Sequence, residues 1–269
     1  MKRFDRVLLV TDFDGTLNDD RGETPENVLE AIRYFTENGG FFTAGTGRTY
    51  QGLRRYAHTE LFNAPALLAN GAMAYDYRTQ TIAFLDGIGD EGVAFIRRLT
   101  KAFPDISVEM YPFDETYAVH ISPDTERHFT NQGIPYTVVS DPDEAPRPWA
   151  KVMLCCPTGR SADVQAYLRK EGMLGFLPTD GTFVEVLQKG VNKGSGLLKL
   201  ADLLSVPYGR VYAAGDGYND VDMLRCAAGA FVPCNGSAEA LAAATHVVRS
   251  NNDGAIAHAI EILDSVYST

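Results

Sequence analysis

The sequence has little positive charge and no long apolar run. Its 269 residues include 24 lysines and arginines against 35 aspartates and glutamates, which gives a formal charge of −11. This charge repels a phosphate backbone and disfavours a nucleic-acid partner. The first apolar run, residues 7–10, is too short for a signal peptide or a membrane span, and no other run approaches the length of a span. We therefore expect no membrane partner.

Cysteine is scarce, and two common motifs are missing. The four cysteines show no C-x-x-C spacing and no nearby histidine pair, which disfavours a zinc site. Free thiols in a reducing cytosol are the simplest interpretation, so we expect a cytoplasmic protein. The chain also lacks the P-loop G-x-x-x-x-G-K-[ST] and the G-x-S-x-G turn of serine hydrolases.

Both ends of the chain alternate strand-like and helix-like segments. The pattern predicts strands at residues 6–11, 41–45, 65–70, 210–214 and 229–232. It predicts helices from an N-cap at Thr24 to Gly39-Gly40, and near residues 49–58, 193–204, 219–227, 237–244 and 253–266. Strands that alternate with helices imply a parallel sheet covered on both faces, which is an α/β fold.

The middle of the chain has a different pattern and most of the prolines. Strand-like runs at 108–111, 117–121 and 152–156 are separated by helical segments near 90–103, 123–132 and 161–171. This predicts an α+β insertion with its own mostly antiparallel sheet. We place the insertion at residues 81–185, and the core is then built from residues 1–80 and 186–269.

Two acidic residues, Asp12 and Asp14, directly follow the first predicted strand. Ligands bind at the carboxyl ends of parallel strands, and strand alternation directs both carboxylates one way while Phe13 turns into the core. Two such carboxylates repel unless a cation lies between them or one of them holds a proton. Mg²⁺ prefers oxygen ligands of this kind. For this pair alone, an ordinary solvated acidic loop is the alternative.

A second acidic pair, Asp216 and Asp220, follows another predicted strand in Gly215-Asp216-Gly217-Tyr218-Asn219-Asp220. Both acids can reach the same cation if the two strand ends share one edge of the sheet. Mg²⁺ usually binds only a few carboxylates and keeps several waters or phosphate oxygens, which fits this set. A calcium loop is the alternative, but its closing glutamate is not present.

Two further segments are suited to phosphate. Gly45-Thr46-Gly47-Arg48 joins a predicted strand to a helix, so its hydroxyl, backbone N–H groups and helix N-terminus could bind an anion. Lys193 also opens a predicted helix and could neutralise phosphate as a point charge. Taken alone, Thr46 is more often a capping residue and Lys193 a solvated one.

Together and in this order, the acidic segment at 12–16, Thr46, Lys193 and the segment 215–220 resemble the four motifs of the haloacid dehalogenase (HAD) superfamily. The long insertion, Asn70-Gly71 and Asn252-Asp253-Gly254 are similar to its Cof-type branch with a C2 (type IIB) cap. The resemblance implies a Rossmann-like, doubly wound parallel core and an α+β cap that closes over the site. It also implies a Mg²⁺-dependent phosphatase that hydrolyses small phosphate monoesters, such as sugar phosphates.

The resemblance also implies a role for each motif residue. Asp12 is the nucleophile that becomes phosphorylated, and Asp14 is the general acid/base. The Asp12 carboxylate, the Asp14 backbone carbonyl and Asp216 hold the metal, with Asp220 in support. The expected contacts to the phosphoryl group or the rest of the substrate come from Thr46, Gly47, Arg48, Lys193 and Asn219. An actual dehalogenase is disfavoured, because that branch lacks the acid/base aspartate.

Other functions remain open on the same motifs. A phosphomutase or phosphotransferase would use them with an acceptor other than water, and a metabolite-binding module would keep the fold without the chemistry. In the insertion, polar or aromatic side chains on or beside strands are candidate substrate contacts: Glu109, Tyr111, His120, Lys151 and Glu185. The expected partner is a small phosphorylated metabolite, and we expect a monomer or a small homo-oligomer.

Overall fold

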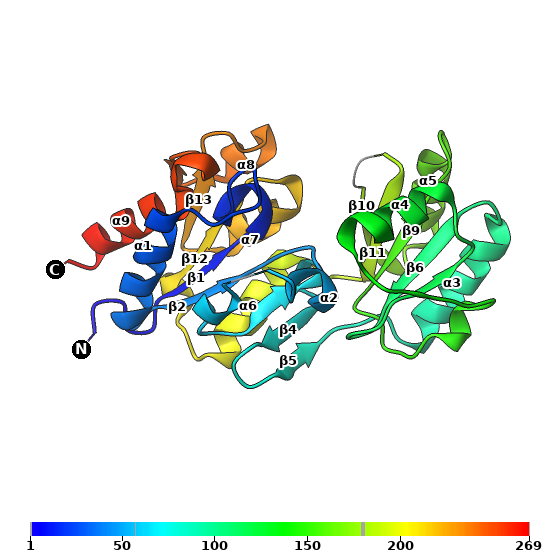
Figure 1. Ribbon diagram of the computed structural model, residues 1–269, viewed down its shortest axis with the longest axis horizontal. Helices are drawn as coiled ribbons and strands as arrows, with labels where there is room; N and C mark the ends of the chain where they lie inside the picture. The colour runs from blue at the N-terminus through cyan, green and yellow to red at the C-terminus, as the bar shows by residue number, and fades with distance from the viewer. Residues whose placement is uncertain (1, 57, 179–180, 269) are drawn as a thin grey trace. The chain divides into compact units, whose positions relative to one another are not determined.

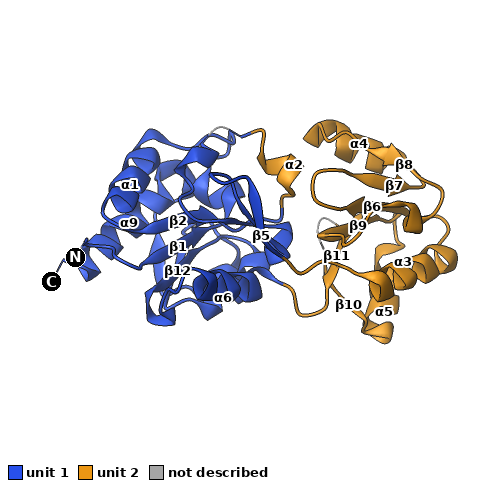
Figure 2. Cartoon of the chain, turned by 90° about the horizontal axis from the view of Figure 1, so that it is seen from below, with its two compact units in different colours: residues 1–47, 56–84, 192–269 blue, residues 48–55, 85–191 orange. Residues whose placement is uncertain are grey.

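The computed structural model describes residues 2–56, 58–178 and 181–268. The chain divides into two compact units, coloured separately in Figure 2. Unit 1 contains residues 1–47, 56–84 and 192–269, and unit 2 contains residues 48–55 and 85–191. These bounds differ from the predicted insertion at 81–185. Strand β5 (Thr81–Leu85) joins the sheet of β3 and β4, and β11 (Phe183–Gln188) pairs with β9.

Unit 1 is built on a five-stranded sheet in the order β14-β13-β12-β1-β2, and every neighbouring pair is parallel. Its strands are β1 (Leu8–Thr11), β2 (Phe41–Ala44), β12 (Val211–Ala214), β13 (Gly229–Pro233) and β14 (His246–Val248). A small sheet of β3 (Ala66–Leu68), β4 (Met73–Asp76) and β5 lies in the same unit. Because β1 is buried along its whole length, it has the continuous apolar sequence of a central strand.

Helices cover both faces of the parallel sheet, as the sequence predicted. Helices α1 (Glu26–Glu37) and α9 (Ala255–Val266) pack together, as Figure 1 shows, while α6 (Lys193–Leu203) packs against α7 (Val221–Cys226). Helix α8 (Ala238–Ala243) contacts α7. The core beneath α6 and α7 includes Leu8, Val10, Leu197 and Leu200. The predicted doubly wound α/β fold is therefore confirmed.

Two local predictions in the N-terminal region were wrong. Thr24 is not the N-cap of α1, because Pro25 occupies that position and its carbonyl accepts the first helical N–H bonds. The Thr24 hydroxyl instead donates a hydrogen bond of 2.7 Å to Oδ1 of Asn18. The helix expected at 49–58 ends after one turn, as α2 (Tyr50–Leu53), and the backbone is left-handed at His58, with φ +80°. Gly52 inside that turn lowers its helical propensity.

Unit 2 contains a six-stranded sheet in the order β10-β11-β9-β6-β7-β8. Its other strands are β6 (Ser107–Tyr111), β7 (Tyr117–Val119), β8 (Thr137–Val138), β9 (Lys151–Cys155) and β10 (Leu174–Pro178). All neighbouring pairs are antiparallel except β7 and β8. The mostly antiparallel sheet expected in the middle of the chain is thus present.

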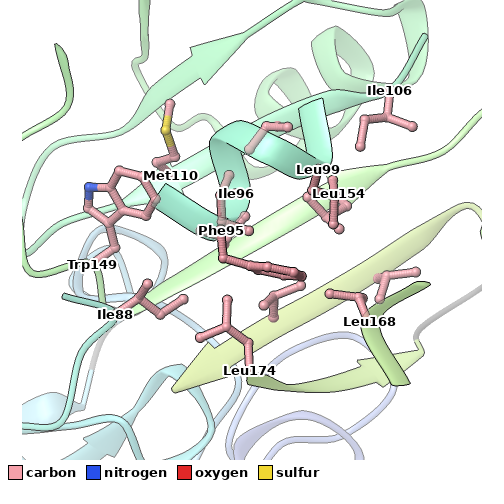
Figure 3. Packing of buried hydrophobic residues seen from close by; sticks show 14 of the residues in the cluster. Ile88, Phe95, Ile96, Leu99, Ile106, Met110, Trp149, Leu154, Leu168 and Leu174 are labelled. Atoms are coloured by element: carbon pink, nitrogen blue, oxygen red, sulfur yellow. The ribbon is translucent and has the colours of Figure 1, made fainter. Parts of the chain in front are cut away.

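The two faces of this sheet differ in chemistry. One face carries α3 (Asp90–Ala102) and α5 (Ser161–Glu171), and Figure 3 shows the apolar core there, with Phe95, Leu99, Leu154 and Leu168 among its members. Helix α4 (Pro123–Gln132) contributes Phe129 to a smaller cluster with Tyr111 and Met153. The same face carries charged side chains, because Glu109 and Lys151 lie two positions before Tyr111 and Met153 on their strands.

Short helical turns complete the described chain. They are η1 (Phe13–Leu17), η2 (Thr59–Leu61), η3 (Ala69–Gly71), η4 (Pro142–Glu144), η5 (Tyr208–Arg210), η6 (Tyr218–Asp220) and η7 (Asn251–Asp253). Four of them, η1, η3, η6 and η7, contain residues that the sequence analysis singled out. None of the helices formed by the described residues has the length and apolar character needed to cross a membrane.

Candidate active site

Three carboxylates meet at the carboxyl edge of the parallel sheet. Asp12 follows β1, and its backbone N–H donates to the carbonyl of Ala214 at the end of β12 (2.7 Å). This contact joins the two strand ends and brings Asp216 and Asp220 toward Asp12. Among the described residues, these three acids form a group whose carboxylate oxygens lie within 4.8 Å of one another. The fold therefore brings Asp12 close to Asp216 and Asp220, which follow it in the sequence by more than 200 residues.

The segment after Asp12 is shaped around Asp216. Gly15 has φ +79°, and a Cβ at this position would lie 2.8 Å from Oδ2 of Asp216. Thr16, which is buried, donates a hydrogen bond of 2.6 Å from Oγ1 to Oδ1 of Asp216. The glycine gives the carboxylate room, and the threonine orients it.

The two acids of the first motif lie in different surroundings. Asp12 is 8% exposed, whereas Asp14 is exposed and is not one of the three clustered acids. Phe13 between them is buried and meets the ring of Tyr56 edge-on, with ring centroids 5.0 Å apart. An exposed carboxyl beside a buried one suits two different roles, because only the exposed group exchanges protons freely with solvent.

Lys193, the first residue of α6, is fully buried beside the acids. Its Nζ donates to Oδ1 of Asp12 at 2.5 Å and to Oδ1 of Asp220 at 2.6 Å. The preceding Asn192 caps the helix by accepting a hydrogen bond from the backbone N–H of Ser195 (2.8 Å). A buried ammonium is stable only when it is paired, and these two carboxylates provide the pairing.

The site carries more negative than positive charge. Burial and the charge of Asp220 raise the pKa of Asp12 to about 8, although Lys193 acts in the opposite direction. Burial also raises the pKa of Asp216, against the hydrogen bond from Thr16. Burial lowers the pKa of Lys193, but the Asp12 and Asp220 carboxylates outweigh this effect and raise it. If all three carboxylates are ionised, one ammonium leaves two negative charges, which a divalent cation would offset.

Asp220 also organises the backbone around the site. Its Oδ2 accepts hydrogen bonds from the backbone N–H groups of Asp216 (3.1 Å) and Gly217 (2.9 Å). Its Oδ1 is bound by Lys193. Protein donors therefore occupy both carboxylate oxygens of Asp220. Through these bonds Asp220 holds two things in place: the loop that carries Asp216, and the ammonium of Lys193.

Thr46, Gly47 and Asn219 are connected through Asn70, a residue absent from the predicted site. The backbone N–H of Asn70 donates to the carbonyl of Thr46 (2.9 Å). The Oδ1 of Asn70 accepts a hydrogen bond from Nδ2 of Asn219 (3.0 Å). A Cβ on Gly47 would lie 3.1 Å from the Asn70 amide nitrogen. The buried Asn70 thus links the segment after β2 to the turn that contains Asn219.

The turn around Asn70 has an unusual backbone. Ala69, Asn70 and Gly71 all have positive φ, at +49°, +52° and +90°. A Cβ on Gly71 would overlap the carbonyl oxygen of Asn192, so η3 presses directly on the start of α6. The Asn-Gly dipeptide, which tolerates left-handed backbone, is the sequence signal that could have identified this turn as part of the site.

The other candidates belong to unit 2. Arg48 is the first residue of that unit. Glu109, Tyr111, Lys151 and Glu185 are buried on β6, β9 and β11, and Tyr111 donates to Glu109 while Lys151 pairs with Glu185 at 3.2 Å. His120 is exposed just beyond β7 and has left-handed backbone, with φ +54°.

Known proteins are similar to this chain over nearly its whole length. The protein YxeH from Bacillus subtilis (strain 168) is 26% identical over 95% of this chain and 97% of its own length. The 5-amino-6-(5-phospho-D-ribitylamino)uracil phosphatase YitU from the same organism is 24% identical, over 93% of this chain and 94% of its own. A haloacid dehalogenase-like hydrolase from Bacteroides thetaiotaomicron has a structure similar to this one, with a TM-score of 0.83 and 23% identity over 96% of this chain and 99% of its own.

The family comparison agrees with the motifs. Residues 9–260 match the family described as haloacid dehalogenase-like hydrolase. This range contains all four segments from which the resemblance was inferred, and the strand ends of unit 1 bring three of those segments together around Asp12. The chain belongs to the haloacid dehalogenase-like hydrolases.

Proposed function

We propose that this hydrolase is a Mg²⁺-dependent phosphatase of small phosphate monoesters, such as sugar phosphates, and acts in the cytoplasm. The observation that carries the proposal is the buried Asp12, held between the ammonium of Lys193 and the carboxylates of Asp216 and Asp220. An aspartate nucleophile needs a neighbouring cation before an anionic phosphate can approach. This arrangement supplies one ammonium, and its excess of carboxylates would attract a metal cation as well.

The donor set fits a hard divalent cation. Carboxylates from Asp12 and Asp216 are the proposed direct ligands, together with the backbone carbonyl of Asp14. Asp220 is proposed to position these ligands without binding the metal directly, because Lys193 and two backbone N–H groups already donate hydrogen bonds to its oxygens. When bound, Mg²⁺ offsets the repulsion between the nucleophile and the phosphoryl oxygens and orients the group.

The chain's own residues then carry two substitution steps at phosphorus. A carboxylate oxygen of Asp12 forms a bond to phosphorus, and the bond from phosphorus to the leaving alcohol oxygen breaks as Asp14 gives its proton to that oxygen. A water molecule next attacks the aspartyl-phosphate and gives a proton to Asp14. Inorganic phosphate leaves, and Asp12 and Asp14 return to their starting states. The exposure of Asp14 suits this exchange of protons.

The phosphoryl oxygens need donors on several sides. We propose Lys193, the hydroxyl of Thr46, the backbone N–H of Gly47 and the amide of Asn219, with Arg48 as a further contact. Asn70 supports this set, since it binds both the Thr46 carbonyl and Asn219. We further propose that the inserted segment, predicted at 81–185, is the cap and that its polar side chains contact the leaving group.

The nucleophile assignment is tested with Asp12→Asn, using an aryl phosphate and Mg²⁺. The expected result is loss of nearly all phosphate release, because an amide cannot form the aspartyl-phosphate. Asp222→Asn is the matched control, since this exposed aspartate lies on α7 and should leave the rate unchanged. Hydrolysis by Asp12→Asn at the rate of the unchanged chain would contradict the mechanism.

The reaction type is tested separately with sugar phosphates as substrates. A phosphatase releases inorganic phosphate and free sugar. An isomeric sugar phosphate without phosphate release would instead show a phosphomutase and overturn the hydrolase proposal.

A further inference from the structure

The segment that follows the proposed phosphate site leaves unit 1 and belongs to unit 2. The chain passes from unit 1 to unit 2 between Gly47 and Arg48, and it returns to unit 1 at Tyr56. Helix α2 lies inside this segment, and Figure 2 colours it with unit 2. Two of the proposed phosphoryl donors, the hydroxyl of Thr46 and the backbone N–H of Gly47, therefore lie only a few residues before α2.

The side chain of Gln51 is the buried anchor of α2. Gln51 is 5% exposed, and both ends of its carboxamide have partners. Its Nε2 donates to the backbone carbonyl of Asp114, and its Oε1 accepts a hydrogen bond of 2.8 Å from the hydroxyl of the buried Thr116. Because a buried carboxamide needs partners for both atoms, these two bonds fix its orientation. Both partners lie in the β6–β7 loop, residues 112–116.

Two further contacts hold α2 against unit 2. Tyr50 stacks on Phe113 of the β6–β7 loop, with ring centroids 4.7 Å apart and ring planes inclined by 30°. Arg55 donates from Nη1 to the backbone carbonyl of Gln132 at the end of α4 (3.1 Å). A helix of a single turn is marginal by itself, so the position of α2 depends on contacts of this kind.

From these contacts we propose that Gln51 and Thr116 are positioning residues for the phosphoryl group. The proposal rests on the proposed phosphate site at Thr46 and Gly47, and neither positioning residue touches the substrate. They act through the backbone, because an anchored α2 restricts the conformations open to the donors that precede it. A site preorganised in this way loses less entropy when phosphate binds. A residue of the β6–β7 loop in unit 2 therefore contributes to phosphate affinity in unit 1.

The test is the affinity of the Mg²⁺-loaded full chain for inorganic phosphate, measured by isothermal titration calorimetry. Thr116→Val keeps the shape of the buried side chain and removes its hydrogen bond to Gln51, so we expect the Kd for phosphate to rise about three- to tenfold. Thr116→Ser keeps the hydroxyl and should bind nearly as the unchanged chain does. In a chain that already carries Gln51→Leu, Thr116→Val should change the Kd no further, because the shared bond is already absent.

Thr125→Val is the matched control for a loss of stability alone. Thr125 is also a buried threonine of unit 2, and its hydroxyl lies 3.0 Å from that of Ser122, at the end of α4 opposite to Gln132. Both valine variants lose one buried hydrogen bond, so urea denaturation should show similar losses of stability. Only Thr116→Val should lose phosphate affinity.

Hydrogen exchange provides a second measurement. Energetic coupling between two sites is reciprocal, so bound phosphate should in turn restrain the β6–β7 loop. We expect saturating phosphate to slow the exchange of backbone amides within residues 112–118 in the unchanged chain, and to slow it much less in Thr116→Val. Equal protection in both chains would contradict the coupling.

Equal phosphate affinity of Thr116→Val and Thr125→Val would overturn the inference, as would a further loss from Thr116→Val in the Gln51→Leu background. The proposed function is measured separately, as phosphate release from an aryl phosphate. If the unchanged chain hydrolyses the ester while the two valine variants bind phosphate alike, the mechanism stands and the coupling fails. If the chain releases no phosphate but its affinity for phosphate falls only in Thr116→Val, the coupling stands and the mechanism fails.

Discussion

Thr16 donates a hydrogen bond from Oγ1 to Oδ1 of Asp216 at 2.6 Å, although the two residues are 200 positions apart in the sequence. Both sit at the carboxyl edge of the parallel sheet, one after β1 and the other after β12. The threonine follows the proposed nucleophile and acid/base by only a few residues, so the proposed chemistry and the orientation of the proposed metal ligand Asp216 both depend on a single segment.

Replacement of Thr16 by valine should weaken the response to Mg²⁺. Valine keeps the shape of the buried side chain but lacks the donor, so Asp216 loses its orientation. We expect aryl phosphatase activity at limiting Mg²⁺ to fall about 10–100-fold, as measured by metal titration. Thr16→Ser keeps the hydroxyl and should retain most of the response. Equal metal dependence of the valine and serine variants would show that this hydrogen bond is unimportant.

Replacement of Lys193 by methionine should destabilise the fold. The change leaves Asp12 and Asp220 buried without their shared ammonium, for an expected cost of about 3–5 kcal/mol in the free energy of unfolding. Urea denaturation measures this cost. Lys199→Met on the same helix is the control, because Lys199 is exposed and its contact with Phe84 contributes about 0.5–1 kcal/mol. Similar losses for both variants would contradict the pairing.

Replacement by alanine should destabilise the fold more at Gly71 than at Gly22, a glycine of similar backbone conformation with no atom near its Cβ position. Gly71 has φ +90° and Gly22 has φ +79°, but only the Cβ at Gly71 would meet the backbone of Asn192. Backbone strain alone predicts a loss of about 1–2 kcal/mol for Gly22→Ala. The overlap at Gly71 adds about 1–3 kcal/mol and displaces the start of α6. Thermal or urea unfolding of both variants, together with their activity, checks the difference.

Asn251 should contribute more to stability than its neighbour Asn252. The buried Asn251 donates from Nδ2 to the carbonyl of Asn18 (3.1 Å) and to Oδ1 of Asp20 (2.9 Å), which ties the loop after η1 to η7. Asn251→Ala removes the donor to the buried carbonyl of Asn18, at an expected cost of about 1–3 kcal/mol. Asn252→Ala removes an exposed contact to Asp20 and should cost about 1 kcal/mol or less. The reverse order in urea denaturation would be inconsistent with this clamp.

Binding of Mg²⁺ should stabilise the chain even without substrate. At a free Mg²⁺ concentration about one hundred times its Kd, the expected gain is about 2.7 kcal/mol, read as a rise in Tm after chelator-treated protein is supplied with the metal. Asp216→Asn should abolish most of this rise, whereas Asp222→Asn should keep it. An equal rise in both variants would place the metal away from the acidic cluster.

Much of the fold could be read from the sequence because its signals are local. The apolar run of β1 and the spacing of Val28, Leu29, Ile32 and Phe35 in α1 are periodic patterns that reflect burial directly. Strands with weaker patterns were missed, among them β14 and the two-residue β8. Short edge strands bury little apolar surface, so their pattern is faint. The cap of α1 was misplaced by one residue because the Thr24 hydroxyl bonds to Asn18 in the preceding loop and not to the helix.

The identity and order of the chemical groups can be read from the sequence alone: an acidic pair after a strand, a threonine between a strand and a helix, a lysine at a helix start, and a second acidic segment. These follow from strand ends and helix starts, which local patterns reveal. Three contacts follow from the three-dimensional packing and not from the sequence pattern: Asn70 joins Thr46 to Asn219, Thr16 orients Asp216, and His128 contacts Glu109. These contacts form only when elements that are distant in the sequence pack together, so no local sequence pattern predicts them.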